Sequence, residues 1–433
     1  MSRSPAIDKA RSISLIAISL SVLIGCEKAI DEFVESPIRS FENQVGTRFS
    51  EVRSFDFKPP EVRDISLEYA SGGNAIWGAI GRSDHGKLYL GASTHAGKDG
   101  TAFLYQYDPL NSTLTPEGDV LGQLQRLGLY KPGMGQNKLH SKFYQADDDY
   151  LYFSSFDEQG EDTGVNPTWG GHLWRKKEDD KNWEHVLATQ EALIAVNLAG
   201  NYVYSLGYWD HVLYQFDTQS DEVKRVVVGS VPNHISRNFL VDPQGHAYVP
   251  EVILDSSGTI QAQLNEYDTR LELIGTYAMP SYKGKNMAAH HGIIGYTSMA
   301  SGNILFTTSD GGLYELDVFS KSGDKLSYLG MMHPDGGAYI PSLFSLDGND
   351  LIAGVGRVPG KKSYEWIIYE LRTRFSVTYK MDTSFLKDTL LYGTLTRDDE
   401  GNFYLVGRGR NRRGENFRPV LLQIPVSSLW PTE

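Results

Sequence analysis

Hydrophobic and polar positions follow a pattern that recurs seven times along the chain. Each copy has a turn rich in Gly, Asp or Asn, a short apolar run, and a second apolar run that in its fullest form ends in an acid. Alternation with a period of two residues predicts β-strands, and the tight turns predict antiparallel neighbours. The second runs occupy 104–108 (LYQYD), 213–217 (LYQFD), 264–268 (LNEYD) and 313–317 (LYELD), with weaker copies at 173–175, 368–371 and 421–424.

The spacing of the copies points to one repeat architecture. The first apolar runs begin at residues 88, 151, 202, 247, 304, 351 and 403, which gives a repeat of roughly 45 to 63 residues. Periods of about 50 residues with four strands each are typical of β-propeller blades. A single blade cannot bury both of its faces, whereas blades stacked around a ring can. We therefore predict an all-β fold, a seven-bladed β-propeller over residues 61–433.

The last repeat lacks one strand. It shows only three strands of its own, at 390–397, 403–406 and 419–424, while the segment 61–70 alternates enough to form another. We expect this N-terminal strand to complete the seventh blade. Such pairing closes the ring and removes an exposed sheet edge.

The first 26 residues have a different character. A basic start precedes an apolar stretch at 13–24, which is shorter than an ordinary membrane span. The run ends in LIGC, which resembles a bacterial lipobox, and Cys26 is the only cysteine of the chain. We predict a lipoprotein signal peptide at 1–26, lipidation of Cys26, and a tether at 27–60. The expected location is outside the cytoplasm, lipid-anchored at the bacterial outer membrane or cell surface; an ordinary buried cysteine is the alternative.

Charge and cysteine content narrow the function classes. A formal net charge of −13 argues against general nucleic-acid binding. One cysteine permits no intrachain disulfide and no cysteine metal site. A structural Ca²⁺ or Zn²⁺ ion stays open, without a ligand set to name. The acid pairs at 147–149 and 398–400 fall in turns away from the expected site, so a two-carboxylate glycosidase has little support. We expect a monomer.

One face of the predicted propeller gathers chemically versatile side chains. The loop entering the first strand and the loop joining the second strand to the third emerge on this face in every blade. His85 and His246 fall in turns on the opposite face, and we interpret both as solvated. For each candidate taken singly, packing is the competing interpretation. The candidates are His140, His172, Tyr208, Trp209, His211, Asn233, His234, Arg237, Arg357, Arg408 and Arg410, together with His290 and His291.

A cleft lined by His, Tyr and Arg suits β-elimination at a uronic acid. Loss of the C5 proton builds negative charge, which an Arg, an Asn or a metal beside the carboxylate stabilises. A His or Tyr removes that proton, and a Tyr or His protonates the leaving O4. Arginines of the last blade would hold sulfates or neighbouring uronates, because a guanidinium matches both groups.

The chain resembles the seven-bladed propeller ulvan lyases and, more distantly, the propeller oligogalacturonate lyases. The resemblance is carried by short motifs at 140–142 (HSK), 170–174 (GGHLW) and 233–237 (NHISR), and by Tyr208. It implies a polysaccharide lyase acting on an acidic, uronate-containing and sulfated, ulvan-like polysaccharide.

The resemblance also implies residue roles. His140 and Tyr208 would be the base/acid couple, Arg237 the carboxylate neutraliser, and His172 a second active-site imidazole. Trp209 would be a platform on which a sugar stacks. The remaining residues expected to bind substrate are Asn233, His234, His211, Arg357, Arg408 and Arg410.

Two other classes of function stay open. A non-catalytic glycan- or protein-binding propeller lipoprotein would have the same fold, since a fold does not fix a function. A hydrolase of lactone or glycosidic bonds with a metal ion in the channel is the other.

Overall fold

The computed structural model describes residues 57–65, 67, 72–163, 165–230, 234, 236–280, 282, 292–321, 323–384, 386, 388–410 and 416–429. All described residues belong to one compact unit, Glu42–Glu433. The expected signal peptide, Cys26 and most of the expected tether therefore lie outside the described residues.

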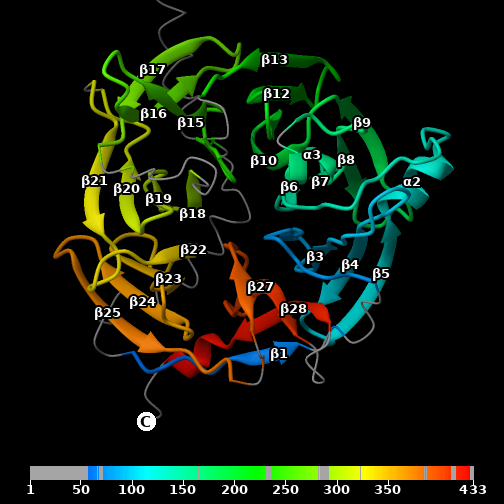
Figure 1. Ribbon diagram of the computed structural model, residues 1–433. Helices are drawn as coiled ribbons and strands as arrows, with labels where there is room; N and C mark the ends of the chain where they lie inside the picture. The colour runs from blue at the N-terminus through cyan, green and yellow to red at the C-terminus, as the bar shows by residue number, and fades with distance from the viewer. Residues whose placement is uncertain are drawn as a thin grey trace, which may run out of the picture. The chain divides into compact units, whose positions relative to one another are not determined.

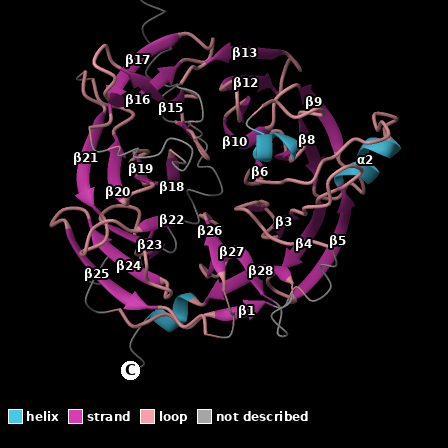
Figure 2. Cartoon of the chain, viewed as in Figure 1, coloured by secondary structure: helices cyan, strands magenta, loops and turns pink. Residues whose placement is uncertain are grey.

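The described residues form the predicted all-β propeller. Seven four-stranded antiparallel sheets follow one another around a ring (Figures 1 and 2). Each of the seven first apolar runs forms the second strand of a blade, and each of the seven second runs lies in the third strand. The alternation in the sequence was therefore sufficient to locate the two central strands of every blade.

The first four blades share the order first, second, third and fourth strand from the inside outward. Their strands are, in blade one, β2 (Ile80–Arg82), β3 (Leu88–Ala92), β4 (Phe103–Asp108) and β5 (Thr113–Asp119); in blade two, β6 (Tyr144–Gln145), β7 (Tyr150–Phe156), β8 (Gly171–Lys177) and β9 (Glu184–Thr189); in blade three, β10 (Leu193–Ala199), β11 (Tyr202–Gly207), β12 (Val212–Asp217) and β13 (Val223–Val227); in blade four, β14 (Leu240–Val241), β15 (Ala247–Leu254), β16 (Ile260–Tyr267) and β17 (Leu273–Ala278).

The last three blades complete the ring, and short helices lie in the connections. The strands are, in blade five, β18 (Ile293–Ser298), β19 (Ile304–Thr308), β20 (Gly312–Leu316) and β21 (Leu326–Met331); in blade six, β22 (Tyr339–Ser345), β23 (Leu351–Arg357), β24 (Glu365–Glu370) and β25 (Phe375–Lys380); in blade seven, β26 (Leu390–Tyr392), β27 (Phe403–Arg410) and β28 (Phe417–Ile424). The helices are α2 (Val120–Arg126), α3 (Gln159–Thr163) and the 3₁₀ helix η3 (Val426–Leu429).

The seventh blade is closed by the N-terminal strand, as predicted. β1 (Arg63–Ile65) pairs antiparallel with β28, with Arg63 opposite Gln423. Arg418 on β28 donates to Asp64 Oδ2 over 2.6 Å. The two ends of the propeller are thereby held in one sheet, so that β28 is no longer an edge strand.

A tyrosine on the second strand explains why the repeated phrase carries a polar residue. The amide of Gln106 on β4 donates to the hydroxyl of Tyr89 on β3 over 2.7 Å, and Gln215 donates to Tyr204 over 2.8 Å. Buried hydroxyls need such partners. We name the set the bonded tyrosines; its members, each at most 1% exposed, are Tyr89, Tyr152, Tyr204, Tyr248 and Tyr404.

The hydrophobic core lies between blades rather than within them. One buried cluster contains Leu90 of β3, Trp174 of β8 and Val406 of β27, so blade one is packed against both of its neighbours. Trp174 and Trp366 are completely buried. Burying aromatic residues of this size contributes a large share of the stabilisation in such stacked sheets.

Candidate functional site

A pocket lies where the innermost segments of all seven blades meet. We call it the channel pocket, and its empty volume is about 400 Å³. The first strands or the segments adjoining them supply every lining residue, as expected for the centre of a propeller. These residues are Trp77, Gly78, His140, Lys142, Ile194, Arg237, Asn238, Ile294, Tyr339, Pro341, Tyr392 and Gly393.

His140 and Arg237 both line this pocket, from segments that precede the first strands of their blades. β6 begins only at Tyr144 and β14 at Leu240. A serine side chain replaces a backbone partner beside His140, because Ser141 Oγ accepts from the backbone N–H of Ser154 over 2.7 Å. The segment around His140 therefore joins the regular ladder of blade two only at Tyr144, and His140 lies in the channel pocket before it.

Three tyrosines from three blades surround Arg237. Burial raises the pKa of Tyr208 and that of Tyr392 to about 12, and the positive charge of Arg237 opposes the rise in both. Burial also raises the pKa of Tyr339, again against Arg237. Within the described residues, none of the three hydroxyls makes a hydrogen bond to another protein group. We name Tyr208, Tyr339 and Tyr392 the channel tyrosines.

A carboxylate from blade two approaches His140. His140 is 9% exposed, and its Nε2 lies 3.8 Å from Glu161 Oε1 on α3. Glu161 is also 3.3 Å from the amine of Lys138, which contacts the ring of His95 over 2.9 Å. A negative charge beside an imidazole favours its protonated form. Glu161 is thus placed to stabilise an imidazolium at His140 after proton uptake.

Lys142 forms part of the channel pocket and was missed by the sequence analysis. Its amine donates to Asn238 Oδ1 over 2.8 Å and lies 4.9 Å from the ring centroid of Tyr296. Burial lowers the pKa of Lys142 to about 7. The available signal was spacing, because residues two apart on an extended segment point the same way as His140 does.

Tyr208 is held by an adjacent buried acid, which the sequence did not reveal. Glu191 accepts backbone N–H groups from Trp209, Asp210 and Val212 over 2.8–3.2 Å. Burial raises the pKa of Glu191 to about 7, although these hydrogen bonds oppose the rise. Trp209 packs against Tyr208, with ring centroids 3.9 Å apart. The turn that carries Tyr208 is therefore fixed through its backbone.

His172 is not brought into the channel pocket. It is 4% exposed, and its Nδ1 lies 2.9 Å from Nε2 of His185 on β9. Burial lowers the pKa of His172 to about 3, and His185 adds to this effect. Both rings line a different pocket, together with Trp169. The expected role as a second imidazole beside His140 has no geometric support.

His211 and His234 are engaged within the protein. The ring of His211 hydrogen-bonds to the backbone oxygen of His234. His234 Nδ1 lies 2.8 Å from Ser230 Oγ, and its Nε2 lies 2.5 Å from the hydroxyl of Tyr282. Both side chains are buried. Asn233, His290 and His291 lie outside the described residues.

The three arginines predicted to bind substrate differ in their surroundings. Arg408 lies 5.3 Å from the ring centroid of Trp77, at the channel pocket. Arg357 lies 5.5 Å from the ring of Tyr364. Arg410 is paired with Asp388 over 3.2 Å, so its charge is already compensated.

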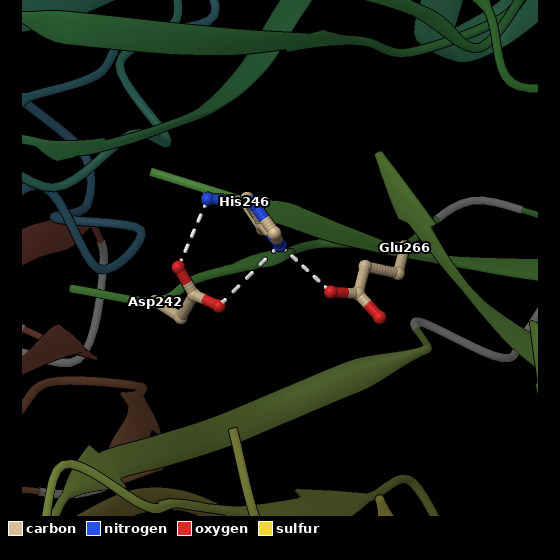
Figure 3. A group of neighbouring side chains, drawn as sticks. All are labelled: Asp242, His246 and Glu266. Atoms are coloured by element: carbon tan, nitrogen blue, oxygen red, sulfur yellow. Dashed lines mark hydrogen bonds and ion pairs between the residues drawn. The ribbon is translucent and has the colours of Figure 1, made fainter. Parts of the chain in front are cut away.

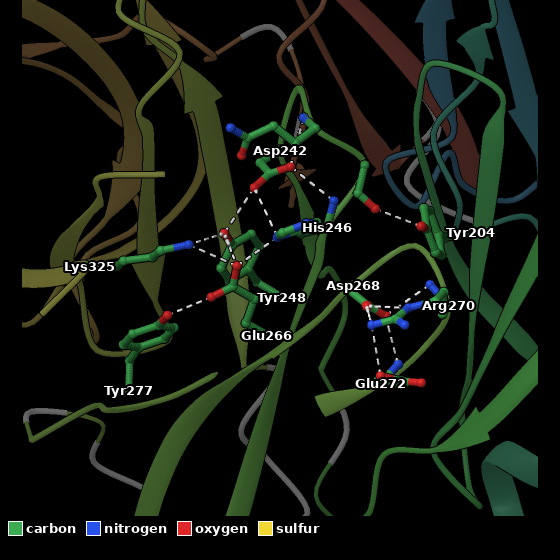
Figure 4. Close-up of polar contacts among 12 residues, drawn as sticks. Tyr204, Asp242, His246, Tyr248, Glu266, Asp268, Arg270, Glu272, Tyr277 and Lys325 are labelled. Carbon is green, nitrogen blue, oxygen red and sulfur yellow. Dashed lines mark hydrogen bonds and ion pairs between the residues drawn. The ribbon is translucent and has the colours of Figure 1, made fainter. Parts of the chain in front are cut away.

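A second polar cluster occupies the turn at the start of blade four. Atoms of Asp242, His246 and Glu266 that could ligate a metal all lie within 4.8 Å of one another (Figure 3). His246 Nδ1 lies 2.7 Å from Glu266 Oε1, so our interpretation of His246 as solvated is wrong. The amine of Lys325 lies 2.8 Å from the same oxygen of Glu266 (Figure 4). The hydroxyl of Tyr248 lies within hydrogen-bonding distance of both carboxylates, Asp242 and Glu266.

This cluster is a satisfied network. Burial raises the pKa of Asp242. For Glu266 burial acts the same way, but hydrogen bonds from Lys325, Tyr277 and His246 hold its pKa below the usual value. The ammonium group of Lys325 therefore supplies, beside the carboxylates, the positive charge that a metal ion would otherwise provide.

No helix within the described ranges is long and apolar enough to cross a membrane.

Comparisons with known proteins agree with the fold and go no further. No protein-family model and no curated protein sequence matches this chain. The chain is similar to the extracellular domain of a hybrid two-component system from B. thetaiotaomicron, with 13% identity and a TM-score of 0.49, covering 85% of this chain and 41% of that one. It therefore spans less than half the length of that structure.

Two further solved structures are similar to this chain. YCF48 bound to D1 peptide gives 10% identity and a TM-score of 0.49, covering 86% of this chain and 97% of that one. U3-55K gives 11% identity and a TM-score of 0.50, covering 85% and 100%. Identities this low concern the fold alone: the described chain is a seven-bladed β-propeller whose activity has to be argued from its own residues.

Proposed function

We propose that this protein is a polysaccharide lyase that cleaves an acidic, uronate-containing, sulfated polysaccharide by β-elimination. The observation that supports it most is the environment of Arg237 in the channel pocket. Within the described residues, the hydroxyls of Tyr339 and Tyr392, which line the pocket, and of Tyr208 near Arg237 make no hydrogen bond to a protein group. A structural cluster would satisfy those groups internally. Groups with unused hydrogen-bonding capacity, gathered in a pocket, favour an external ligand.

The reaction requires one proton to leave and one to arrive. A base takes the C5 proton of the uronate, the C4–O4 bond breaks as the C4=C5 double bond forms, and the departing O4 receives a proton. Arg237 neutralises the substrate carboxylate, which makes the C5 proton more acidic and stabilises the charge that develops. No oxidant and no water is consumed.

The two proton-transfer roles go to groups in opposite protonation states. Tyr208, whose pKa is raised to about 12, carries its proton at neutral pH and serves as the acid that protonates O4. His140 is the base, and Glu161 at 3.8 Å stabilises the imidazolium it becomes. Lys142 at the pocket adds a group that binds the substrate or exchanges protons, since its pKa lies near 7.

The proposal includes export and a lipid anchor at Cys26, on the outer membrane or cell surface. It rests on the lipobox-like run and the single cysteine. A lyase held at the surface would act on a polymer too large to enter the cell.

The test is the ultraviolet absorbance of the unsaturated uronate, followed while purified protein is incubated with ulvan, polygalacturonate, alginate and glycosaminoglycans in turn. We expect absorbance to rise with one of them and to stay flat for Arg237→Gln. No rise in absorbance with any of these polymers, with or without divalent cations, would contradict the proposed lyase activity. Retained binding of a glycan in that case would identify a non-catalytic glycan-binding propeller.

A further inference from the structure

We propose that a second subsite, formed by Arg357, Lys362 and Lys380 between blades six and seven, binds a further anionic group of a polyanionic glycan. The channel pocket would hold one charged sugar, and this subsite would hold the sulfate or carboxylate of another. The identity of the glycan rests on the proposed function, whereas the subsite itself rests on the geometry below.

The subsite is a surface pocket distinct from the channel pocket. It has an empty volume of about 1,180 Å³ and no lining residue in common with the channel pocket. Arg357, Lys362 and Lys380 contribute its cations, Ser363 and Thr383 hydroxyl groups, and Phe417 an aromatic ring. Sugars bind to this combination of an apolar ring and directed polar groups.

Its three cations have no salt bridge with any acid of the described residues. Arg357 instead faces the ring of Tyr364 at 5.5 Å. The pocket also contains two carboxylates. Asp388 pairs with Arg410 over 3.2 Å. Asp382 accepts the backbone N–H of Ser384 over 3.0 Å; hydrogen bonds from Ser384 lower the pKa of Asp382, and the charge of Lys380 adds to this effect. Positive charge therefore exceeds negative charge in this pocket, on a chain whose net charge is −13.

The two pockets share a wall. Tyr339 lines the channel pocket, and Arg357, its partner across the β22–β23 ladder, lines the subsite. The guanidinium of Arg408 lies 5.3 Å from the ring of Trp77 in one pocket and 4.4 Å from the ring of Phe417 in the other. Positive charge thus continues from Arg237 through Arg408 to the subsite.

The chemistry selects an oxyanion carried on a polymer. A guanidinium binds sulfate or carboxylate through paired hydrogen bonds, and lysine amines add point charges. The net negative charge of the rest of the chain repels the same polymer. The polymer is therefore steered to the positively charged surface that runs from Arg237 through Arg408 to the subsite. Sulfate and carboxylate share this chemistry, and the experiment separates them.

The experiment measures binding without turnover. Fluorescence anisotropy of labelled dextran sulfate is followed with wild type, with the double variant Lys362→Gln/Lys380→Gln, and with the control Lys361→Gln/Arg372→Gln. The control removes the same charge from the same blade, but Lys361 already pairs with Asp335 over 3.5 Å and Arg372 with Asp350 over 3.6 Å. All four side chains are exposed, so folding should be preserved.

We expect the double variant to bind about tenfold more weakly and with a shallower salt dependence. The control should bind like wild type, and uncharged dextran should not bind. Labelled polygalacturonate in place of dextran sulfate distinguishes a carboxylate subsite from a sulfate subsite by which polymer loses more affinity. The subsite is overturned if wild type binds neither polyanion, if the double variant binds as wild type does, or if the control weakens equally.

Parallel turnover measurements separate this inference from the lyase. Selective loss of binding in a protein without lyase activity would leave the subsite standing and remove the proposed function. Lyase activity in a protein whose double variant binds the polyanion as wild type does would support the proposed function and remove the subsite.

Discussion

Two sets of tyrosines occupy the same propeller and differ in what their hydroxyls do. The bonded tyrosines lie on second strands, and three of them contact an acid of the adjacent turn, as Tyr404 does with Asp398 over 2.8 Å. The channel tyrosines stand around Arg237, and within the described residues their hydroxyls are not hydrogen-bonded. Burial raises the pKa in both sets, so burial alone does not mark a functional tyrosine.

The difference between the two sets indicates which buried tyrosines stabilise the fold and which are available to a ligand. A buried hydroxyl that donates to a carboxylate stabilises the fold, and its loss leaves that carboxylate short of a donor. A hydroxyl directed into a pocket contributes little to folding and remains available to a ligand. The two sets should therefore respond oppositely to the same substitution, Tyr to Phe.

The largest effect is expected for Tyr208→Phe on turnover. Removing the proton donor should lower the rate about 10²- to 10⁴-fold, while the free energy of unfolding changes by less than about 0.5 kcal/mol. Tyr204→Phe in the same blade is the matched control and should keep its turnover per folded molecule. Rates on the identified polymer, with denaturant unfolding of both variants, check this. Equal turnover of Tyr208→Phe and wild type would remove Tyr208 from the mechanism.

The next effect is on stability. Tyr248→Phe should cost about 2–3 kcal/mol of unfolding free energy, because Asp242 and Glu266 both lose a donor in a buried, charged network. The equivalent Tyr404→Phe should cost about 1 kcal/mol, since Asn402 still donates to Asp398 over 2.9 Å. Urea unfolding of both variants measures the difference. Equal costs would mean that charge at the blade-four turn adds nothing.

An effect of similar size concerns Glu191 and pH. The pKa of Glu191 is raised from 4.5 to about 7 in the folded protein, so the unfolded chain loses this proton first. Its contribution to stability is full below pH 4.5 and is lost as the pH rises through 7. Glu191→Gln should remove this dependence, which is on the order of 3 kcal/mol between the two ends. Unfolding curves across this range, compared with wild type, test it; parallel pH profiles of the two proteins would contradict it.

The smallest effect is expected at the other channel tyrosines. Tyr339→Phe and Tyr392→Phe should each change the unfolding free energy by less than about 0.5 kcal/mol, because no protein hydrogen bond of the described residues is lost. Affinity for the polymer should fall for at least one of them. Thermal unfolding shows the first point, and a drop comparable to that of Tyr248→Phe would place that residue with the bonded tyrosines.

Much of the fold could be predicted because it is encoded locally. Alternation, turns and repeat length located β3 and its six equivalents, and the missing strand of blade seven correctly pointed to β1. The first strands were predicted less well. Around His140 a serine side chain replaces a ladder partner, and nothing in the hydrophobic pattern marks such a substitution.

The site could be predicted only in part. His140 and Arg237 lie in the channel pocket, and Tyr208 stands beside Arg237. His172 lies within β8 rather than in the loop before it, and its ring contacts His185 on the neighbouring strand and not the channel pocket. His246 was misinterpreted because Glu266 and Lys325 are distant in sequence.

The sequence by itself determined the all-β class, the number of blades and the strands that carry the candidates, because period and turn chemistry act over a few residues. Only the tertiary structure decided which polar side chains share a pocket and which satisfy one another. Ring closure brings residues hundreds of positions apart, such as Trp77 and Arg408, into contact. Whether a buried polar group has a partner depends on such contacts, and local sequence does not encode them.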